Sequence, residues 1–261
     1  MGKNLDKSTI SSPSELAELT TRFIEQFCSR MAFPSAWDIL VNRHPKDDID
    51  RSPYAGPLHT TLENQSLTIH LYEKDLMGIS TLALQGWLDT ELARRHLQLE
   101  PSMYRVNFDK EIRPLINISG SGLQMVRHMV AHLKTGLKNL IAAQIVIEMG
   151  NSMALLYYYT YKINPSVEEK ENYQRLYPHQ WIRAIFLCRK NKRFAPVALM
   201  ADKGIAAELV SYWWICHTYI SPEDKRFLET LFSLSNQNPV KHFSETLVEM
   251  FKFVKSQLLV R

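Results

Sequence analysis

Apolar residues recur every three to four positions along the second half of the chain. In the longest such stretch, about residues 123–149, this spacing puts five aliphatic side chains on one face: Val126, Val130, Leu133, Leu137 and Ile141. The pattern is typical of an amphipathic helix with one buried face. Prolines and a Gly-Asn-Ser break divide the rest of the chain into segments of ordinary helix length. Everything after about residue 115 is therefore predicted to be helical.

The first part of the chain has a mixed pattern. Residues 1–12 are polar and predict a flexible N-terminus. Ser12-Pro13 then opens a helix expected to reach about Phe33, and a short second helix is expected from Ser35 to about Arg43. Residues 58–73 are rich in Thr, Ile and Leu, with Asn64-Gln65 between two runs, which predicts a small two-stranded β element.

These elements predict an α+β protein dominated by helices. A helix is expected from about residue 80 to Leu97, and residues 103–108 suggest another short strand. Residues 13–261 are expected to form a single globular domain. The change from mixed to all-helical pattern near residue 115 marks a sub-boundary within that domain.

Composition narrows the class of protein. Apolar residues make up 45% and charged residues 22%, close to the globular average, so the chain is expected to fold rather than stay disordered. The formal charge of +4 is too small to predict nucleic-acid binding. Three cysteines make a disulfide framework improbable and favour a reducing compartment. The N-terminus has no apolar signal region and no stretch reaches membrane-spanning length, so a soluble, cytoplasmic protein without a membrane partner is expected.

One segment has the order of elements found at a metallopeptidase active site. Residues 67–73 read as a strand, Gly78-Ile79-Ser80 follows as a loop, and residues 82–94 then form a helix with Gly86 and Glu91-Leu92-Ala93. This order resembles the strand, loop and active-site helix of zincin-type metallopeptidases. Their helix carries H-E-x-x-H, often within G-x-x-x-H-E-L-A-H.

The chemistry of that motif needs two imidazoles one helical turn apart on a zinc ion, and a glutamate between them that takes a proton from the bound water. Here the two ligand positions hold Thr90 and Arg94, and only the general-base position, Glu91, matches. Threonine is a poor zinc ligand and arginine is cationic. The resemblance therefore implies the fold without zinc, a cofactor or peptidase activity.

Glu208 is the candidate for a further residue of this site. In the glutamate-type zincins that the segment resembles, the third zinc ligand is an acid on a later helix. Glu208 lies on a predicted helix from Ile205 to Ile220, on the same face as Tyr212 and Ile215. A carboxylate in an apolar stripe needs a partner, and Arg94 could supply one. The predicted function is a zincin-like pseudoenzyme that binds a protein partner through Thr90, Glu91, Arg94 and Glu208.

Two other classes of function remain open. A metal-dependent hydrolase could use Glu91 as general base, with non-standard ligands among His70, His96 and Glu208. A helical scaffold unrelated to zincins would instead use Glu91 and Arg95 as an i,i+4 ion pair on a solvated helix face.

Two further patterns, a histidine pair and a basic run, are predicted to be structural features of helices rather than binding sites. His128 and His132 lie one turn apart on the polar side of the long helix, which favours a solvated pair over a metal site. The run of residues 189–193 carries four basic side chains and favours a basic helix C-terminus facing water over a nucleic-acid patch.

Overall fold

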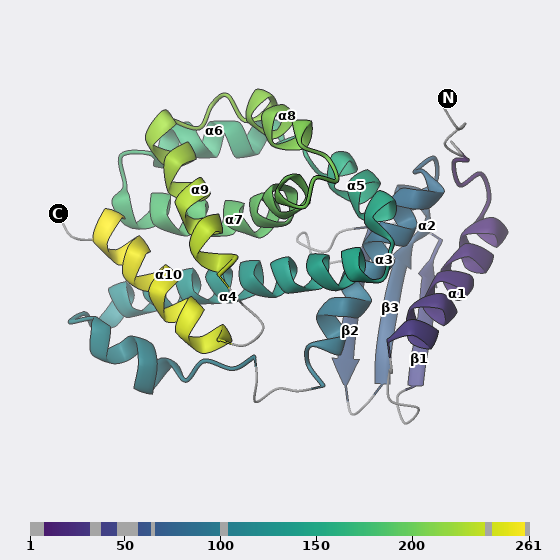
Figure 1. Cartoon of the computed structure of the whole chain (residues 1–261), viewed down its shortest axis with the longest axis horizontal. Coiled ribbons are helices and arrows are strands. Elements are labelled where there is room, and N and C mark those ends of the chain that lie inside the picture. The colour runs from purple at the N-terminus through teal and green to yellow at the C-terminus, as the bar shows by residue number, and fades with distance from the viewer. Residues whose placement is uncertain are drawn as a thin grey trace. The chain divides into compact units, whose positions relative to one another are not determined.

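The structure is a computed structural model that describes residues 8–31, 38–45, 57–63, 66–99, 104–237 and 242–258. It is predominantly helical with one small sheet, as the sequence predicts (Figure 1). The chain divides into two compact units, residues 1–96 with 145–161, and residues 97–144 with 162–261. The sub-boundary predicted near residue 115 lies inside the second unit. The single domain expected over residues 13–261 stays a prediction.

The first unit combines the sheet with helices. Its elements are α1 (Pro13–Arg30), β1 (Asp38–His44), β2 (Leu58–Glu63), β3 (Ser66–Tyr72), α2 (Glu73–Leu76), α3 (Thr81–His96) and α5 (Ser152–Tyr161). The sheet order is β1-β3-β2, with β2 antiparallel and β1 parallel to β3. The β element predicted at residues 58–73 is confirmed as a hairpin, whose turn at residues 64–65 lies outside the described residues.

The short helix predicted up to Arg43 is wrong over residues 38–43, which belong to strand β1 (Asp38–His44), and residues 35–37 lie outside the described residues. Each residue of β1 has a partner on β3, from Asp38 opposite Ser66 to His44 opposite Tyr72. The β-branched Ile39 and Val41 suit a strand, and pairing with a strand some 28 positions later in the chain overrides the local helical pattern.

The hydrophobic core of the first unit lies on one face of the sheet. Leu67, Ile69 and Leu71 alternate along β3 and are fully buried. Helices α1 and α3 pack against each other, and α3 packs closely against α5. Residues 8–12 join this unit: Ile10 is buried and exchanges backbone hydrogen bonds with Gly78 and Ile79. A flexible N-terminus is predicted for residues 1–12. Of these, residues 1–7 lie outside the described residues.

Every described element of the second unit is helical, as predicted for the chain after about residue 115. Its elements are a π-helical turn (Phe108–Ile112), a 3₁₀ turn (Arg113–Leu115), most of α4 (Gly120–Glu148), α6 (Val167–Leu176), α7 (Gln180–Asp202), α8 (Glu208–Cys216), α9 (Pro222–Ser235) and α10 (Phe243–Leu258). The strand suggested for residues 103–108 is wrong over residues 104–108, and Met103 lies outside the described residues. Among the described helices, none is both long and apolar enough to cross a membrane.

Helix α7 continues through a proline because α4 supplies the hydrogen bond that the proline removes. Pro196 has no N–H to donate to the carbonyl of Lys192, four residues earlier. The side-chain amide of Asn139, on α4, donates to that carbonyl at 3.0 Å. Gly136, one turn before Asn139, lets Asn191 approach, since a Cβ at this glycine would lie 3.2 Å from the Asn191 amide nitrogen.

We expect Asn139→Ala to lower the free energy of unfolding by about 1–3 kcal/mol, because the Lys192 carbonyl loses its partner. In a Pro196→Ala background the restored N–H at position 196 serves that carbonyl, so the same substitution should have a smaller effect. Denaturant unfolding of the four proteins in this double-mutant cycle measures the coupling. Additive effects of the two substitutions would contradict this account of the contact.

Candidate functional site

The predicted site helix, α3, is buried along its centre. Thr90 is 2% exposed and Glu91 is 9% exposed. The Thr90 hydroxyl donates a 2.6 Å hydrogen bond to the carbonyl of Gly86, one turn earlier. The position of the first zinc-binding histidine in the motif that α3 resembles therefore holds a hydroxyl that is already hydrogen-bonded to its own helix.

Glu91 is the centre of a charged network. Its Oε1 accepts a 2.8 Å hydrogen bond from Nη1 of Arg94, and its Oε2 accepts one from the Thr60 hydroxyl of β2 at 3.3 Å. The Thr60 hydroxyl in turn accepts from Nε of Arg95 at 2.7 Å, and Nη2 of Arg95 donates to the Thr60 carbonyl. The pair expected between Glu91 and Arg95 is thus replaced by a direct pair with Arg94 and a link to Arg95 through Thr60.

The electrostatics at Arg94 oppose a metal ion. The Glu91 carboxylate raises the pKa of the Arg94 guanidinium, against the effect of burial, and Tyr158 and Tyr159 of α5 act in the same direction as Glu91. A permanent cation therefore occupies the second ligand position, 2.8 Å from the acid that would have to serve as general base.

Glu208 does not lie in the buried stripe that the sequence predicts. It is exposed at the first residue of α8, and Tyr212 and Ile215 on its face are 43% and 68% exposed. The buried face of α8 carries Leu209 and Trp213 instead. Glu208 belongs to the second unit and Glu91 to the first, so a pairing of Glu208 with Arg94 stays a prediction.

His70, one of the residues proposed as an alternative metal ligand, does not lie on the Glu91 side of the sheet. His70 alternates with the buried Ile69 and Leu71 on β3, so it lies on the opposite face of the sheet from Thr60, the partner of Glu91. On that face Nδ1 of His70 lies 3.2 Å from Nε2 of His44. Within the described ranges, no group of three or more His, Cys, Asp or Glu side chains could hold a metal ion.

Asp89, next to the predicted site, is a buried acid that sequence reasoning missed. Its side chain is 1% exposed and accepts a 2.8 Å hydrogen bond from the Asn151 amide. Arg30 donates to the Asn151 side-chain oxygen at 3.1 Å. Burial raises the pKa of Asp89 to about 6, against the effects of Asn151 and Arg30. Its position three residues before the buried Leu92 was the available signal, because both fall on one helix face.

The raised pKa of Asp89 predicts a pH-dependent effect of Asp89→Asn. Between the ordinary value of 3.8 and about 6, the folded protein holds a proton that the unfolded chain releases. The contribution of Asp89 to stability is therefore largest below about pH 4 and is lost as the pH rises through about 6. Asparagine stays neutral, so the variant should gain up to about 3 kcal/mol relative to the parent protein between pH 4 and pH 8.

Urea unfolding of both proteins across this pH range measures the difference. Asp109→Asn is the control, because the Asp109 side chain is 79% exposed and its replacement should leave the pH profile unchanged. A constant difference between the Asp89 variant and the parent protein at all pH values would contradict the assignment.

The basic run at residues 189–193 is not a helix C-terminus, since α7 continues to Asp202. Lys190 is 4% exposed, and its ammonium pairs with the Glu169 carboxylate. Its Nζ also lies within 6 Å of the ring centroids of Phe186, Trp213 and Tyr219. Burial lowers the pKa of Lys190 to about 8, against the effect of Glu169.

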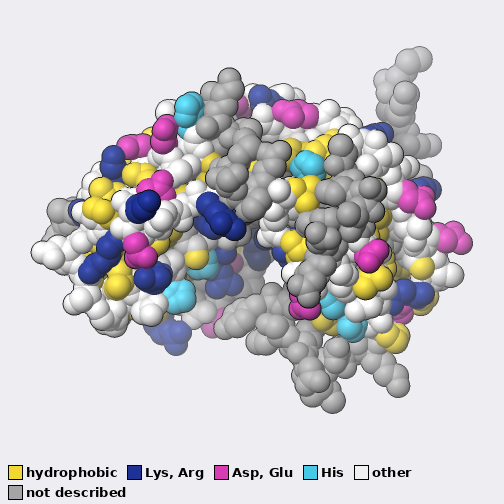
Figure 2. Space-filling view, turned by 90° about the horizontal axis from the view of Figure 1, so that it is seen from below, with side chains coloured by type: hydrophobic (Ala, Val, Ile, Leu, Met, Phe, Trp, Pro, Cys, Tyr) yellow, Lys and Arg dark blue, Asp and Glu magenta, His cyan; other side chains and the backbone are white. Residues whose placement is uncertain are grey.

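On the face seen in Figure 2, Lys and Arg side chains are interspersed with Asp and Glu.

The histidine pair on α4 is only partly solvated. His128 is exposed, but His132 is half-buried. Burial, together with the nearby cations Lys192 and Arg189, lowers the pKa of His132 to about 4. Two cationic side chains beside this imidazole disfavour a metal ion there as well.

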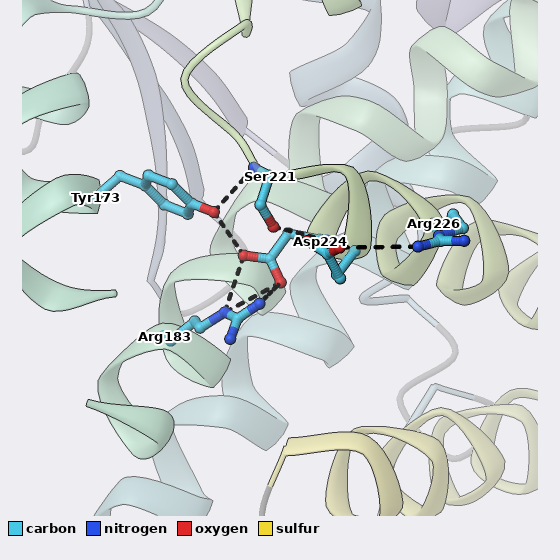
Figure 3. A network of polar contacts seen from close by, with 6 residues as sticks. Tyr173, Arg183, Ser221, Asp224 and Arg226 are labelled. Carbon is cyan, nitrogen blue, oxygen red and sulfur yellow. Dashed lines mark hydrogen bonds and ion pairs between the residues drawn. The ribbon is translucent and has the colours of Figure 1, made fainter. Parts of the chain in front are cut away.

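A second buried network lies in the helical unit (Figure 3). Asp224 is 1% exposed and accepts hydrogen bonds from the Tyr173 hydroxyl at 2.7 Å and from the Arg183 guanidinium at 2.5 and 2.9 Å. The Tyr173 hydroxyl also accepts from the backbone N–H of Ser221, the cap of α9. The network ties α6, α7 and the start of α9 together, and its complete pairing indicates a structural role.

No known protein family matches the sequence, and no curated protein or solved structure matches it either.

Proposed function

We propose that the chain is a zincin-like protein that lacks zinc-peptidase chemistry and acts by binding a protein partner. The observation that carries the proposal is the ion pair between Glu91 and Arg94. A general base must be reached by a water molecule, and Glu91 is only 9% exposed. Both oxygens of Glu91 accept hydrogen bonds from protein groups, Oε1 from Arg94 and Oε2 from Thr60.

The order of elements supports the zincin-like part of the proposal. Strand β3 is followed by the short α2, by the loop at Gly78 and by α3, which carries Glu91 toward β2. This is the strand, loop and helix order on which the sequence resemblance rests. The Thr90 and Arg94 side chains support the loss of zinc chemistry, because neither provides a lone pair suited to zinc.

The charge balance around Glu91 supports binding rather than catalysis. Arg94 and Arg95 bring two cations to one carboxylate, and the Arg94 side chain is 33% exposed. The surplus positive charge suits an acidic group of a partner protein. We further propose a cytoplasmic location, which is supported by the three free thiols Cys28, Cys188 and Cys216.

Quantitative affinity purification tests the binding part of the proposal. Glu91→Gln removes any general base but keeps the shape of the side chain, so it should recover the same partner as the parent protein. Arg94→Glu reverses the half-buried charge beside Glu91 and should lose that partner.

Arg226→Glu is the matched control, because Arg226 is an exposed arginine that also pairs at i,i+3 with a glutamate, Glu223, in the other unit. It should retain the partner. Equal recovery with the Arg94 and Arg226 variants would contradict binding through α3. Loss of the biological role in the Glu91→Gln variant alone would instead favour the hydrolase.

A further inference from the structure

Among the described strands, β1 is paired on one side only. It forms an edge in the order β1-β3-β2, and no other described strand pairs with its outer side. Two of its central side chains are large, apolar and exposed, Leu40 at 52% and Val41 at 37%. Natural edge strands are usually blunted by lysine, proline or a bulge, because their unpaired backbone groups attract another strand. Residues 38–42 contain neither lysine nor proline.

The arginine of β1, Arg43, is held by groups of its own unit. Nε of Arg43 donates to Glu73 at 2.6 Å, and its Nη2 donates to the carbonyl of Pro13 at 3.0 Å. The opposite edge of the sheet differs, because Arg95 donates to both the hydroxyl and the carbonyl of Thr60 on β2. A strand that paired with β2 would have to displace Arg95. Among the described residues, no side chain from another element donates in this way to the backbone at the outer side of β1.

The sequence of β1 is chemically self-complementary. Its central residues show the same pattern in both directions, with three apolar side chains between two polar ones: Asp38-Ile39-Leu40-Val41-Asn42. Antiparallel pairing of two copies about Leu40 places Leu40 opposite Leu40, Ile39 opposite Val41, and Asp38 opposite Asn42. Residues opposite one another then lie on the same face of the joined sheet, as a two-fold axis perpendicular to the sheet requires.

We propose that β1 is a dimerisation surface and that its occupant is β1 of a second copy of this chain. The two sheets join into one with the order β2-β3-β1-β1-β3-β2. Leu40 fills the centre of the contact, and the Asn42 amide donates to the Asp38 carboxylate of the other copy at each end. A contact confined to five residues a side belongs to the weak class of interfaces, so the dimer should depend on concentration. This proposed dimer does not depend on the chemistry around Glu91.

Sedimentation equilibrium of the full chain over a range of concentrations measures the dimer. Leu40→Lys places two ammonium groups opposite each other and should shift the protein to monomer, with dimer affinity lowered at least about tenfold. Ile215→Lys is the control, since Ile215 is an even more exposed apolar side chain, at 68%, on α8. This variant should dimerise like the parent protein.

Mixing two monomeric variants tests the register and guards against misfolding. Leu40→Glu alone should also be monomeric, but an equimolar mixture with Leu40→Lys places opposite charges across the two-fold axis and should restore a heterodimer. A parent protein that stays monomeric at every concentration would overturn the proposal. So would a dimer that Leu40→Lys leaves intact, one that Ile215→Lys also dissolves, or a mixture of the two charged variants that remains monomeric.

Discussion

Replacing Asp224 with alanine should lower the free energy of unfolding of the helical unit by about 3–5 kcal/mol. The side chain is 1% exposed, and its removal leaves the Arg183 guanidinium, which is 18% exposed, without its counter-charge. The Tyr173 hydroxyl loses its acceptor at the same time (Figure 3). Breaking a buried pair by removing one partner is strongly destabilising, because the other charge stays buried.

The neighbouring residue provides the matched control for this substitution. Glu223 is 63% exposed and pairs with the exposed Arg226, so Glu223→Ala should change stability by less than about 1 kcal/mol. Replacing both partners, Arg183→Met with Asp224→Leu, should recover much of the loss, since no buried charge then remains. Chemical denaturation followed by circular dichroism gives all three values. A loss for Asp224→Ala no larger than that for Glu223→Ala would show that the network contributes little.

Gly86→Ala should destabilise the first unit by about 3 kcal/mol or more, although alanine is the better helix former. A Cβ at position 86 would lie 2.1 Å from the carbonyl oxygen of Ala154 and 2.5 Å from its carbonyl carbon. These atoms belong to the backbone of α5 and cannot rotate away, so the two helices would have to separate. The glycine in the motif-like segment is therefore required for the close packing of α3 on α5.

Gly122→Ala is the control for this prediction. A Cβ at this position would lie 2.4 Å from Cγ2 of Ile118, but this methyl belongs to a half-buried side chain that can change rotamer, whereas the Ala154 backbone cannot move aside. Its effect on stability should stay within about 1 kcal/mol. Thermal unfolding of both variants provides the comparison. Similar melting temperatures for the two alanine variants would contradict the close approach of α3 and α5.

Local signals in the sequence were sufficient for most helices and for the β2–β3 hairpin. The start of α1 follows from Ser12, whose hydroxyl accepts from the backbone N–H of Glu15, and from Pro13 in the first turn. The hairpin follows from two β-rich runs separated by two residues. Strand β1 could not be found in this way, because what makes it a strand is its parallel pairing with β3, 28 residues further along.

The buried polar residues were missed for a related reason. Asp89 is held by Asn151, 62 residues away, and Asp224 by Arg183, 41 residues away. The sequence shows charged residues but not the distant partners that make their burial tolerable. Glu208 illustrates the opposite error. Helical spacing places Glu208 and Ile215 on one face of the helix. This face is exposed because α8 packs through its other face, which carries Leu209 and Trp213.

Elemental analysis of the purified protein tests the central claim most directly. If Thr90 is unsuited to zinc and Arg94 forms an ion pair with Glu91 in place of a metal, the protein should contain far less than one zinc ion per chain, even after incubation with zinc followed by removal of the excess. It should also show no hydrolysis that a chelator abolishes. About one firmly bound zinc ion per chain, with peptide hydrolysis that is lost on chelation and in Glu91→Gln, would contradict the account.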